Sequence, residues 1–351
     1  MGQFGHGADS LQMMERYGVK ELIDHSSNVN IFMPGKVKEI LRDLDPQELA
    51  KYPDIHYSHL RAKLSEKYRI DPSHIIVGNG STELIFLLTR LPEIRRIGIV
   101  HPTFGEYARA AELSGKEPVS FYYDSAFRID LKKMDLTKVD ALFICNPNNP
   151  SGNTNHLKTL LDKAKAQNVL LIVDETFMDF AEDQSGSLLP YVQDHDDLFV
   201  LKAVTKFYAM TGVRLGYGFC SPKWIDRLWK IKEPWTINAF AEKLVDAIFD
   251  EDFERRSVTF YKEEIVWMEK ELSKIEGLKI YPTQSNYFLL RLPSHLSAKE
   301  LKERMIIRHG ILIRDCSNYQ GLDTHHIRVN IKERMYNKML IEALQKEITI
   351  G

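Results

Sequence analysis

The sequence predicts an α/β protein with a mostly parallel central sheet. Short apolar runs such as HIIVGNG (74–80), ALFICNPNNP (141–150) and VLLIVDET (169–176) alternate with segments of helical pattern. These runs are apolar on both faces, which is typical of strands that helices cover on either side. Strands of this kind, separated by helices, predict a doubly covered parallel sheet.

The domain organisation follows from the length and from a change of pattern after Ser221. A chain of 351 residues exceeds most single cores, so we expect a large domain and a smaller one. Residues 221–275 are rich in helical pattern, and strands alternating with helices follow them. We predict an N-terminal arm at 1–45 that packs with the small domain and the substrate site, a large domain at 46–245 and a small α/β domain at 246–351.

Composition and charge exclude several classes of protein. The chain is 44% hydrophobic with a net charge of −2, so it offers no basic field for nucleic acid. It contains no apolar run of 18 residues, and the N-terminal MGQFGHGADSLQ lacks the apolar core of a signal peptide. We expect a soluble, cytoplasmic protein without a membrane partner. Neither a disulfide framework nor a metal site is expected from three scattered cysteines, Cys145, Cys220 and Cys316.

Polar residues stand where the predicted strands end. They are Asn79, Pro102, Asn149, Asp174 and Lys206. In open α/β sheets, ligands bind at the carboxyl ends of the strands. Asp174 follows a strongly apolar run, and a buried acid is costly unless it is paired or accepts strong hydrogen bonds. A helix cap or a core salt bridge would also explain this acid.

The segment VGNGST (77–82) ends one strand and opens a helix. Backbone N–H groups at the helix N-terminus, beside the hydroxyls of Ser81 and Thr82, would form an anion cradle. A simple N-cap with Glu83 as its capping-box acid explains the same residues. The chain lacks both GK[ST] and GxGxxG, which argues against a P-loop and a Rossmann dehydrogenase.

Lys206 lies in TKFYAMTGVRLGYGF (205–219), between apolar and aromatic residues. Most lysines are solvated, but an amine in such surroundings could have a lowered pKa and act as a nucleophile. Arg214 could hold a phosphate. Together with an acid, a small-residue loop and the amides of NPNNPSG (146–152), these residues match the needs of pyridoxal phosphate. The amide segment alone would equally well be a turn.

The chain resembles fold-type I pyridoxal-phosphate enzymes of the class I/II aminotransferase superfamily over essentially its whole length. Within this superfamily the chain resembles the histidinol-phosphate aminotransferase branch and, more closely, the cobalamin-pathway threonine-phosphate decarboxylases. Nine motifs resemble those of the decarboxylases in order and spacing. These motifs are HGAD, SSNVN, YPDIHY, GNGSTELIF, NPNNPSG, DETFMDF, TKFYAMTGVRLGY, EPWTIN and ILIRDCSNYQGL. The resemblance implies a large cofactor-binding domain with a small C-terminal domain, and pyridoxal 5'-phosphate as the cofactor.

The resemblance implies a role for each matched cofactor residue. Lys206 would form the Schiff base and shuttle protons, and Asp174 would pair with the pyridinium nitrogen. Asn149 would bond the phenolic oxygen, and Phe104 would stack on the ring. Tyr52 would reach the phosphate of the neighbouring subunit, which implies a homodimer with shared sites. The remaining phosphate ligands would be Ser81, Thr82, Thr205 and Arg214.

The resemblance also implies how a phosphorylated amino acid is bound. Arg328, in HIRVNIK, would hold the substrate carboxylate, and Asn149 would border the substrate. The substrate phosphate would be gripped by His6, Asn28 and Arg314.

Four positions depart from the patterns of the relatives. Aminotransferases place at Phe177 a tyrosine whose hydroxyl bonds the phenolic oxygen, whereas the decarboxylases carry phenylalanine. HGAD differs from the decarboxylase element HGGN at Ala8 and Asp9, and a carboxylate at Asp9 would repel a nearby phosphate. Lys332 replaces an arginine at the edge of the expected site.

The predicted reaction is the decarboxylation of O-phospho-L-threonine to (R)-1-aminopropan-2-yl phosphate in cobalamin biosynthesis, with O-phospho-L-serine open as a second substrate. The enzyme would choose this reaction over transamination through the points at which it anchors the two substrate anions. Phe177 and HGAD argue against the first alternative, a histidinol-phosphate aminotransferase that uses 2-oxoglutarate. An aromatic amino-acid aminotransferase is a more distant alternative. A non-catalytic cofactor-binding regulator lacks support, because the chain has no added helix-turn-helix domain.

Overall fold

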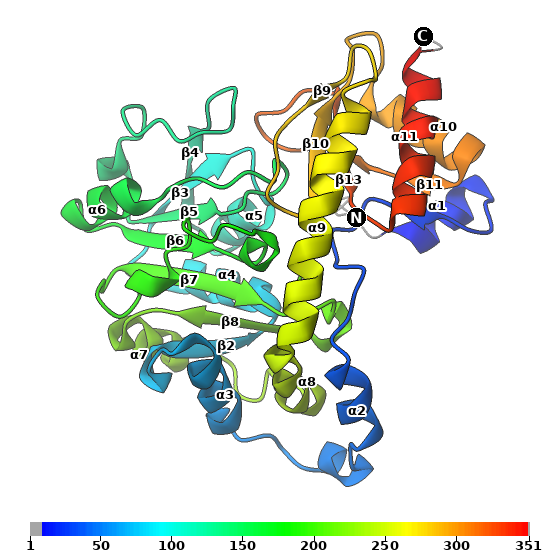
Figure 1. Ribbon diagram of the computed structural model, residues 1–351. Coiled ribbons are helices and arrows are strands. Elements are labelled where there is room, and N and C mark those ends of the chain that lie inside the picture. Colours follow the sequence, from blue (N-terminus) through cyan, green and yellow to red (C-terminus); the bar gives the residue numbers. More distant parts are fainter. Residues whose placement is uncertain (1–8, 350–351) are drawn as a thin grey trace.

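The computed structural model describes residues 9–349, and a seven-stranded sheet forms the centre of its larger part (Figure 1). The strands follow the order β2-β8-β7-β6-β5-β3-β4. Six of these strands run in the same direction and β8 runs opposite to them, so the predicted α/β class with a mostly parallel sheet is confirmed. The bounds are β2 Ile75–Asn79, β3 Arg96–His101, β4 Glu117–Tyr122, β5 Ala141–Cys145, β6 Leu170–Asp174, β7 Leu198–Ala203 and β8 Leu215–Phe219.

Helices cover both faces of this sheet, as the apolar runs require. The side chains of Leu171 and Val173 belong to one buried apolar cluster, and that of Ile172 belongs to the other. Helices α4, α5 and α7 supply the cluster of Ile172, whereas α3, α6 and α9 pack in the opposite one. The bounds are α3 Ser58–Tyr68, α4 Gly80–Arg90, α5 Glu106–Leu113, α6 Lys158–Ala166, α7 Pro222–Ile231 and α9 Glu251–Leu272.

A smaller antiparallel sheet lies toward the C-terminus, with the order β12-β13-β10-β9. Helix α9 extends from beside the large sheet to this smaller one (Figure 1) and contributes to a single apolar cluster that includes side chains of both. The predicted domain boundaries remain a prediction. The bounds are β9 Lys279–Ile280, β10 Tyr287–Arg291, β11 Ile311–Leu312, β12 Arg314–Asp315, β13 His326–Asn330, α10 Ala298–His309 and α11 Arg334–Thr349.

Several elements carry too weak a pattern to be foreseen. Strand β4 lies at the edge of the large sheet and is mostly exposed, so it lacks the continuous apolar run of the central strands. Strand β1, Ile23–Asp24, has two residues and pairs in parallel with β11, which ties the N-terminal segment to the C-terminal part.

The other helices are α1 Ser10–Tyr17, α2 Lys36–Arg42 and α8 Ala239–Leu244. The short 3-10 helices are η1 Pro46–Ala50, η2 Pro72–His74, η3 Leu136–Lys138, η4 Met178–Phe180, η5 Leu189–Tyr191, η6 Thr211–Val213 and η7 Val245–Phe249.

The parallel strands bring chemistry-bearing residues to one edge of the large sheet. Strands β5 and β6 end side by side, with Cys145 directly opposite Asp174. The segment 204–214, between β7 and β8, joins antiparallel neighbours and leaves no room for a helical crossover. Within residues 9–349, no helix has the length and apolar character needed to cross a bilayer.

Candidate active site

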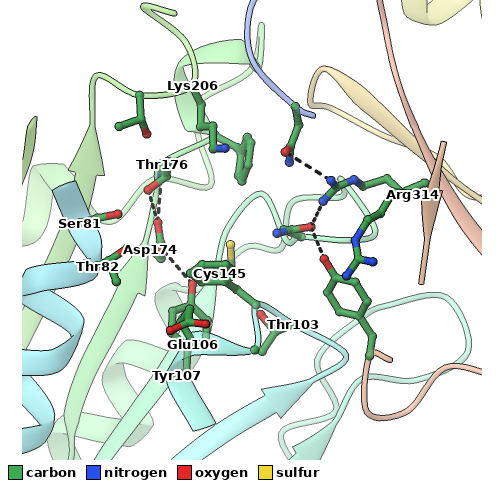
Figure 2. A pocket seen from close by; sticks show the side chains of 18 of the residues that line it. Ser81, Thr82, Thr103, Glu106, Tyr107, Cys145, Asp174, Thr176, Lys206 and Arg314 are labelled. Atoms are coloured by element: carbon green, nitrogen blue, oxygen red, sulfur yellow. Dashed lines mark hydrogen bonds between the residues drawn. The ribbon is translucent and has the colours of Figure 1, made fainter. Parts of the chain in front are cut away.

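A cavity of about 890 Å³ opens at this edge of the sheet (Figure 2). Apart from Tyr52, every predicted site residue in the described part of the chain contributes to its lining. His6 lies outside the described residues. The predicted residues that the cavity brings together are Asn28, Ser81, Thr82, Phe104, Asn149, Asp174, Thr205, Lys206, Arg214, Arg314 and Arg328.

Lys206 follows β7 by three residues, and its side chain extends into the cavity (Figure 2). Among the residues that the structure describes, none forms a hydrogen bond or ion pair with its ammonium group. Burial lowers the pKa of Lys206 to about 8, and the positive charges of Arg328 and Arg214 act in the same direction. Asp174 opposes the shift. The residue is therefore an unpaired amine that is much more often neutral than a surface lysine.

Asp174 ends β6 and is 5% exposed. Its Oδ2 accepts a hydrogen bond of 2.8 Å from the Tyr107 hydroxyl. Its Oδ1 accepts one of 3.0 Å from the backbone N–H of Thr176 and another from the Thr176 hydroxyl. No cation in the described chain forms an ion pair with this carboxylate, so the core salt bridge that the sequence left open is absent there. Three donors stabilise its negative charge inside the cavity.

The start of α4 and the side chain of Arg214 form a cradle for an anion. Gly80 has φ +74°, and a Cβ there would lie 2.5 Å from Arg214 Nη2. A Cβ at Gly216 would lie 2.1 Å from the backbone nitrogen of Ser81. Glycine at these two positions thus lets the guanidinium group and β8 approach the helix N-terminus. The N–H groups of the first helical turn and a guanidinium group converge on one region, a suitable arrangement for phosphate.

The two explanations of this segment given by the sequence are compatible. Glu83 accepts a hydrogen bond of 2.5 Å from the backbone N–H of Asn79, as a capping acid does. In the described part of the chain, the hydroxyls of Ser81 and Thr82 have no hydrogen-bond partner. Both residues line the cavity, so their hydroxyls remain available to a ligand while Glu83 secures the turn.

Arg328 and Asn149 form a buried polar group on the opposite side of the cavity. Arg328 Nη1 donates to Asn149 Oδ1 at 2.5 Å, and the Tyr319 hydroxyl donates to the same oxygen at 3.2 Å. Arg328 Nη2 also donates to the backbone carbonyl of Ser26 at 2.8 Å. Because Asn149 Oδ1 is occupied by two donors, its Nδ2 is the part of the amide that remains for a ligand.

Two buried donors at this side lack a partner in the part of the chain that the structure describes. They are Arg328 Nε and Asn28 Nδ2. An unsatisfied buried donor costs about 1–3 kcal/mol. Both residues line the cavity, and an anionic ligand would satisfy donors of this kind.

Arg314 places a second guanidinium group beside that of Arg328. The two residues are paired in register on β12 and β13, and both are buried. Arg314 Nη2 donates to Asn318 Oδ1 at 2.9 Å, and its Nη1 donates to the carbonyl of Asp315. Two neighbouring buried guanidinium groups repel one another unless negative charge lies near them, so this side of the cavity suits an anionic substrate.

Tyr52 lies away from the cavity of its own chain. It is 82% exposed, and its ring centroid is 4.9 Å from that of Trp235, which is also exposed. Its contribution to the site of a neighbouring subunit remains a prediction.

Of the four positions that depart from the patterns of the relatives, Ala8 lies outside the described residues, and the other three fall into two groups. Phe177 lines the cavity and packs edge to face on Tyr287, with ring centroids 5.2 Å apart. No hydroxyl is therefore present at this position. Asp9 instead pairs with Lys302 of α10 at 3.5 Å, and neither Asp9 nor Lys332 lines the cavity. The Lys302 ammonium thus partly compensates the Asp9 carboxylate that the sequence placed near a phosphate.

Several side chains of the site were missed from the sequence, among them Tyr107, Thr176 and Tyr319. Tyr107 lies in the first turn of α5, three residues after Phe104, which precedes the helix. Both residues line the cavity, so the closeness of Tyr107 to Phe104 in the sequence was a usable signal. Thr176 forms a local turn with Asp174, which the pattern Asp-x-Thr also indicates. Tyr319 reaches Asn149 from a loop 170 positions away, and no local pattern could reveal that contact.

Comparison with known proteins places this site in a family. A model of the aminotransferase class I and II family matches residues 20–344. The threonine-phosphate decarboxylase of Salmonella typhimurium is 35% identical, and the match covers 98% of this chain and 96% of that one. A relative from Caldanaerobacter subterraneus subsp. tengcongensis, provisionally named a threonine-phosphate decarboxylase, is 40% identical over 91% of this chain and 88% of its own. The solved histidinol-phosphate aminotransferase from Clostridium acetobutylicum has a TM-score of 0.89 at 29% identity, and the match covers 94% of this chain and all of that one. The chain belongs to the aminotransferase class I and II family of pyridoxal-phosphate-dependent enzymes.

Proposed function

We propose that this protein is a pyridoxal-phosphate-dependent decarboxylase that converts O-phospho-L-threonine to (R)-1-aminopropan-2-yl phosphate in cobalamin biosynthesis. The observation that carries the proposal is the match, over nearly the whole chain, to relatives named for this activity at 40% and 35% identity. The lining of the cavity supports the proposal. On one side, at the edge of the large sheet, it has residues that suit the cofactor, and on the other side, at β12 and β13, it has the two arginines Arg314 and Arg328.

The residues of the sheet edge fit pyridoxal phosphate. The unpaired hydroxyls of Ser81 and Thr82, with Arg214 and Thr205, would hold its phosphate. Asp174 would face its ring nitrogen, and the Lys206 amine would attach it to the chain. The free Nδ2 of Asn149 would donate to its phenolic oxygen. Phe104, edge to face on Tyr107 at 5.6 Å, would cover one face of the ring.

The two guanidinium groups match the two anions of a phosphorylated amino acid. Arg328 would bind the carboxylate through its unsatisfied Nε. Arg314 would bind the phosphate with Asn28 and with His6. Holding both anions fixes the rotation of the substrate about its α-carbon, and that rotation decides whether the carboxylate or the α-proton leaves.

Bound pyridoxal phosphate would supply electron withdrawal from the substrate α-carbon. The bond between the α-carbon and the carboxylate breaks, and carbon dioxide departs. Lys206 Nζ then gives the α-carbon a proton in place of the carboxylate. A pKa of about 8 suits this task, because the amine gains and loses a proton readily near neutral pH.

We also propose that the active enzyme is a homodimer. Tyr52 and Trp235 form an exposed aromatic pair outside the cavity, which is unusual for side chains of this size on a monomer surface. Insertion of Tyr52 at the phosphate cradle of a second copy would cover the pair and complete that copy's site.

Histidinol-phosphate aminotransferase is the second candidate, favoured by the similarity of the Clostridium acetobutylicum structure. The absence of a hydroxyl at Phe177 argues against it, because the aminotransferases resembled place a tyrosine there. The proposal is tested by incubating the cofactor-loaded protein separately with O-phospho-L-threonine, O-phospho-L-serine, and histidinol phosphate plus 2-oxoglutarate. Carbon dioxide from the first substrate is the expected result. Glutamate from the third, with no carbon dioxide from the first or second, would overturn the proposal in favour of the aminotransferase.

A further inference from the structure

The carboxylate of Asp174 accepts a hydrogen bond from Tyr107, a residue to which the proposed function assigns no contact with cofactor or substrate. Tyr107 is fully buried, and its hydroxyl donates to Asp174 Oδ2 at 2.8 Å (Figure 2). Thr176 satisfies the other carboxylate oxygen from the turn after β6. The two oxygens are thus held by donors from different elements, which fixes the plane of the carboxylate as well as its charge.

Tyr107 is itself rigidly placed. Its ring stacks on Phe143 of β5, with centroids 4.9 Å apart and planes 9° apart, and Phe104 packs against it edge to face. The thiol of Cys145 also lies beside the Tyr107 hydroxyl. Burial raises the pKa of this phenol well above its usual range, so the group remains a neutral donor.

From this arrangement we propose that Tyr107 is a positioning residue that keeps Asp174 as a fixed anion and thereby keeps the proton on the cofactor's ring nitrogen. The inference rests on the proposed placement of that nitrogen at Asp174. Hydrogen bonds donated to a carboxylate stabilise the anion more than the neutral acid. In a contact between a carboxylate and a ring nitrogen, each such donor favours the state with the proton on nitrogen. When a donor is lost, the shared proton moves toward the Asp174 oxygen and the ring withdraws electrons less strongly.

Tyr107→Phe tests the inference, because it removes one oxygen atom and leaves the stacked ring in place. The readout is the nitrogen-15 chemical shift of enzyme loaded with cofactor labelled at the ring nitrogen. We expect this shift to move toward that of an unprotonated pyridine. We also expect kcat to fall on the order of tenfold, the effect of losing one hydrogen bond to a charged group, with little change in KM.

Three further variants, at Tyr123 and Thr176, separate positioning from folding. Tyr123→Phe removes another buried tyrosine hydroxyl, one without a partner in the described residues and outside the cavity lining. We expect it to leave the nitrogen shift and kcat unchanged. Thr176→Ser keeps a hydroxyl for Asp174 and should preserve the wild-type shift, whereas Thr176→Val should move it in the same direction as Tyr107→Phe.

The outcomes distinguish failure of this inference from failure of the proposed function. A Tyr107→Phe enzyme that keeps the wild-type nitrogen shift, while Asp174→Asn changes it, would overturn the role of Tyr107 and leave the proposed cofactor placement intact. If Asp174→Asn also leaves the shift unchanged, the ring nitrogen is not at Asp174 and both proposals fail. Circular dichroism and the melting temperature of each variant identify any that do not fold.

Discussion

The two halves of the cavity are built in different ways. The half at the sheet edge is assembled from short segments in which the chemistry follows a strand by a few residues, as at Asp174 and Lys206. The half at β12 and β13 is assembled from positions that are hundreds of residues apart. Arg328 contacts Asn149 across 179 positions and Ser26 across 302. The residues of the first half thus belong to local sequence motifs, whereas those of the second half come together only when the whole chain has folded.

This difference assigns different tasks to the two halves. The sheet edge is tied to the backbone ends of buried parallel strands and offers a fixed frame for a cofactor. The other half offers two adjacent guanidinium groups, and under the proposed function their ligand decides the reaction. Variants in the first half should abolish the chemistry, and variants in the second should alter which substrate is used and which bond breaks.

The largest expected effect is that of Lys206→Ala. We expect a loss of activity of more than about 10³-fold, because the variant lacks both the attachment point of the cofactor and the proton donor. The visible absorbance of bound cofactor should shift as well. Lys223→Ala, at a half-exposed lysine of α7, serves as the control and should retain full activity. Comparable activity in the two variants would contradict the role of Lys206.

Arg328→Lys should have the next largest effect. The substitution keeps the charge but loses the planar fork that binds Asn149, Ser26 and the proposed carboxylate. We expect kcat/KM for O-phospho-L-threonine to fall by about 10²-fold, a loss of about 2.7 kcal/mol. Cofactor affinity should change much less, because Arg328 is outside the phosphate cradle. Arg291→Lys, at a partly exposed arginine of the neighbouring strand β10, is the matched control. A larger loss of cofactor affinity than of kcat/KM would contradict the assignment of Arg328 to substrate binding.

The pH dependence of cofactor loading should reflect the lowered pKa of Lys206. The neutral amine is the reactive form, so loading of the cofactor-free protein should accelerate as the pH rises and level off above about 8. About a tenth of the amine is neutral at pH 7 and about half at pH 8, so we expect a roughly fivefold difference in rate. Stopped-flow absorbance measures it. A rate that continues to rise tenfold per pH unit up to pH 10 would indicate an ordinary lysine.

Phe177→Tyr should have the smallest effect on total turnover. It should instead change the ratio of amino transfer to decarboxylation. The new hydroxyl would lie in the cavity, at the position where the resemblance leads us to expect a tyrosine in the aminotransferases. We expect a two- to threefold change in kcat, with a larger share of amino transfer to 2-oxoglutarate per carbon dioxide released. Unchanged partition between the two products would show that Phe177 does not contribute to reaction choice. The buried Phe180→Tyr serves as the control for the cost of an added hydroxyl.

The residues that line the sheet-edge half of the cavity could be identified from the sequence because their signals are local. An apolar run that ends in Asp174 and a glycine pair before Ser81 can be recognised without knowing the fold. The residues that support these groups were harder to foresee. Tyr107 was missed because its importance comes from its contact with Asp174 across 67 positions, although it follows the predicted Phe104 by only three residues.

The residues of the other half, Arg314 and Arg328, were predicted from the family resemblance and not from a local sequence pattern. Nothing near Arg314 or Arg328 shows that β12 and β13 place them side by side, since register is a property of the folded sheet. The ion pair of Asp9 was also unpredictable, because its partner Lys302 lies on a helix nearly 300 positions further along the chain. Long-range pairings of charge depend on packing that a motif does not contain.

The proposed activity is tested most directly by the stoichiometry of one reaction. The cofactor-loaded enzyme is incubated with O-phospho-L-threonine and 2-oxoglutarate together, and carbon dioxide, amino-alcohol phosphate and glutamate are quantified. If the two guanidinium groups orient the substrate as proposed, one carbon dioxide is released for each (R)-1-aminopropan-2-yl phosphate formed, and glutamate stays at background. Glutamate formed in step with consumed substrate, without carbon dioxide, would contradict the account.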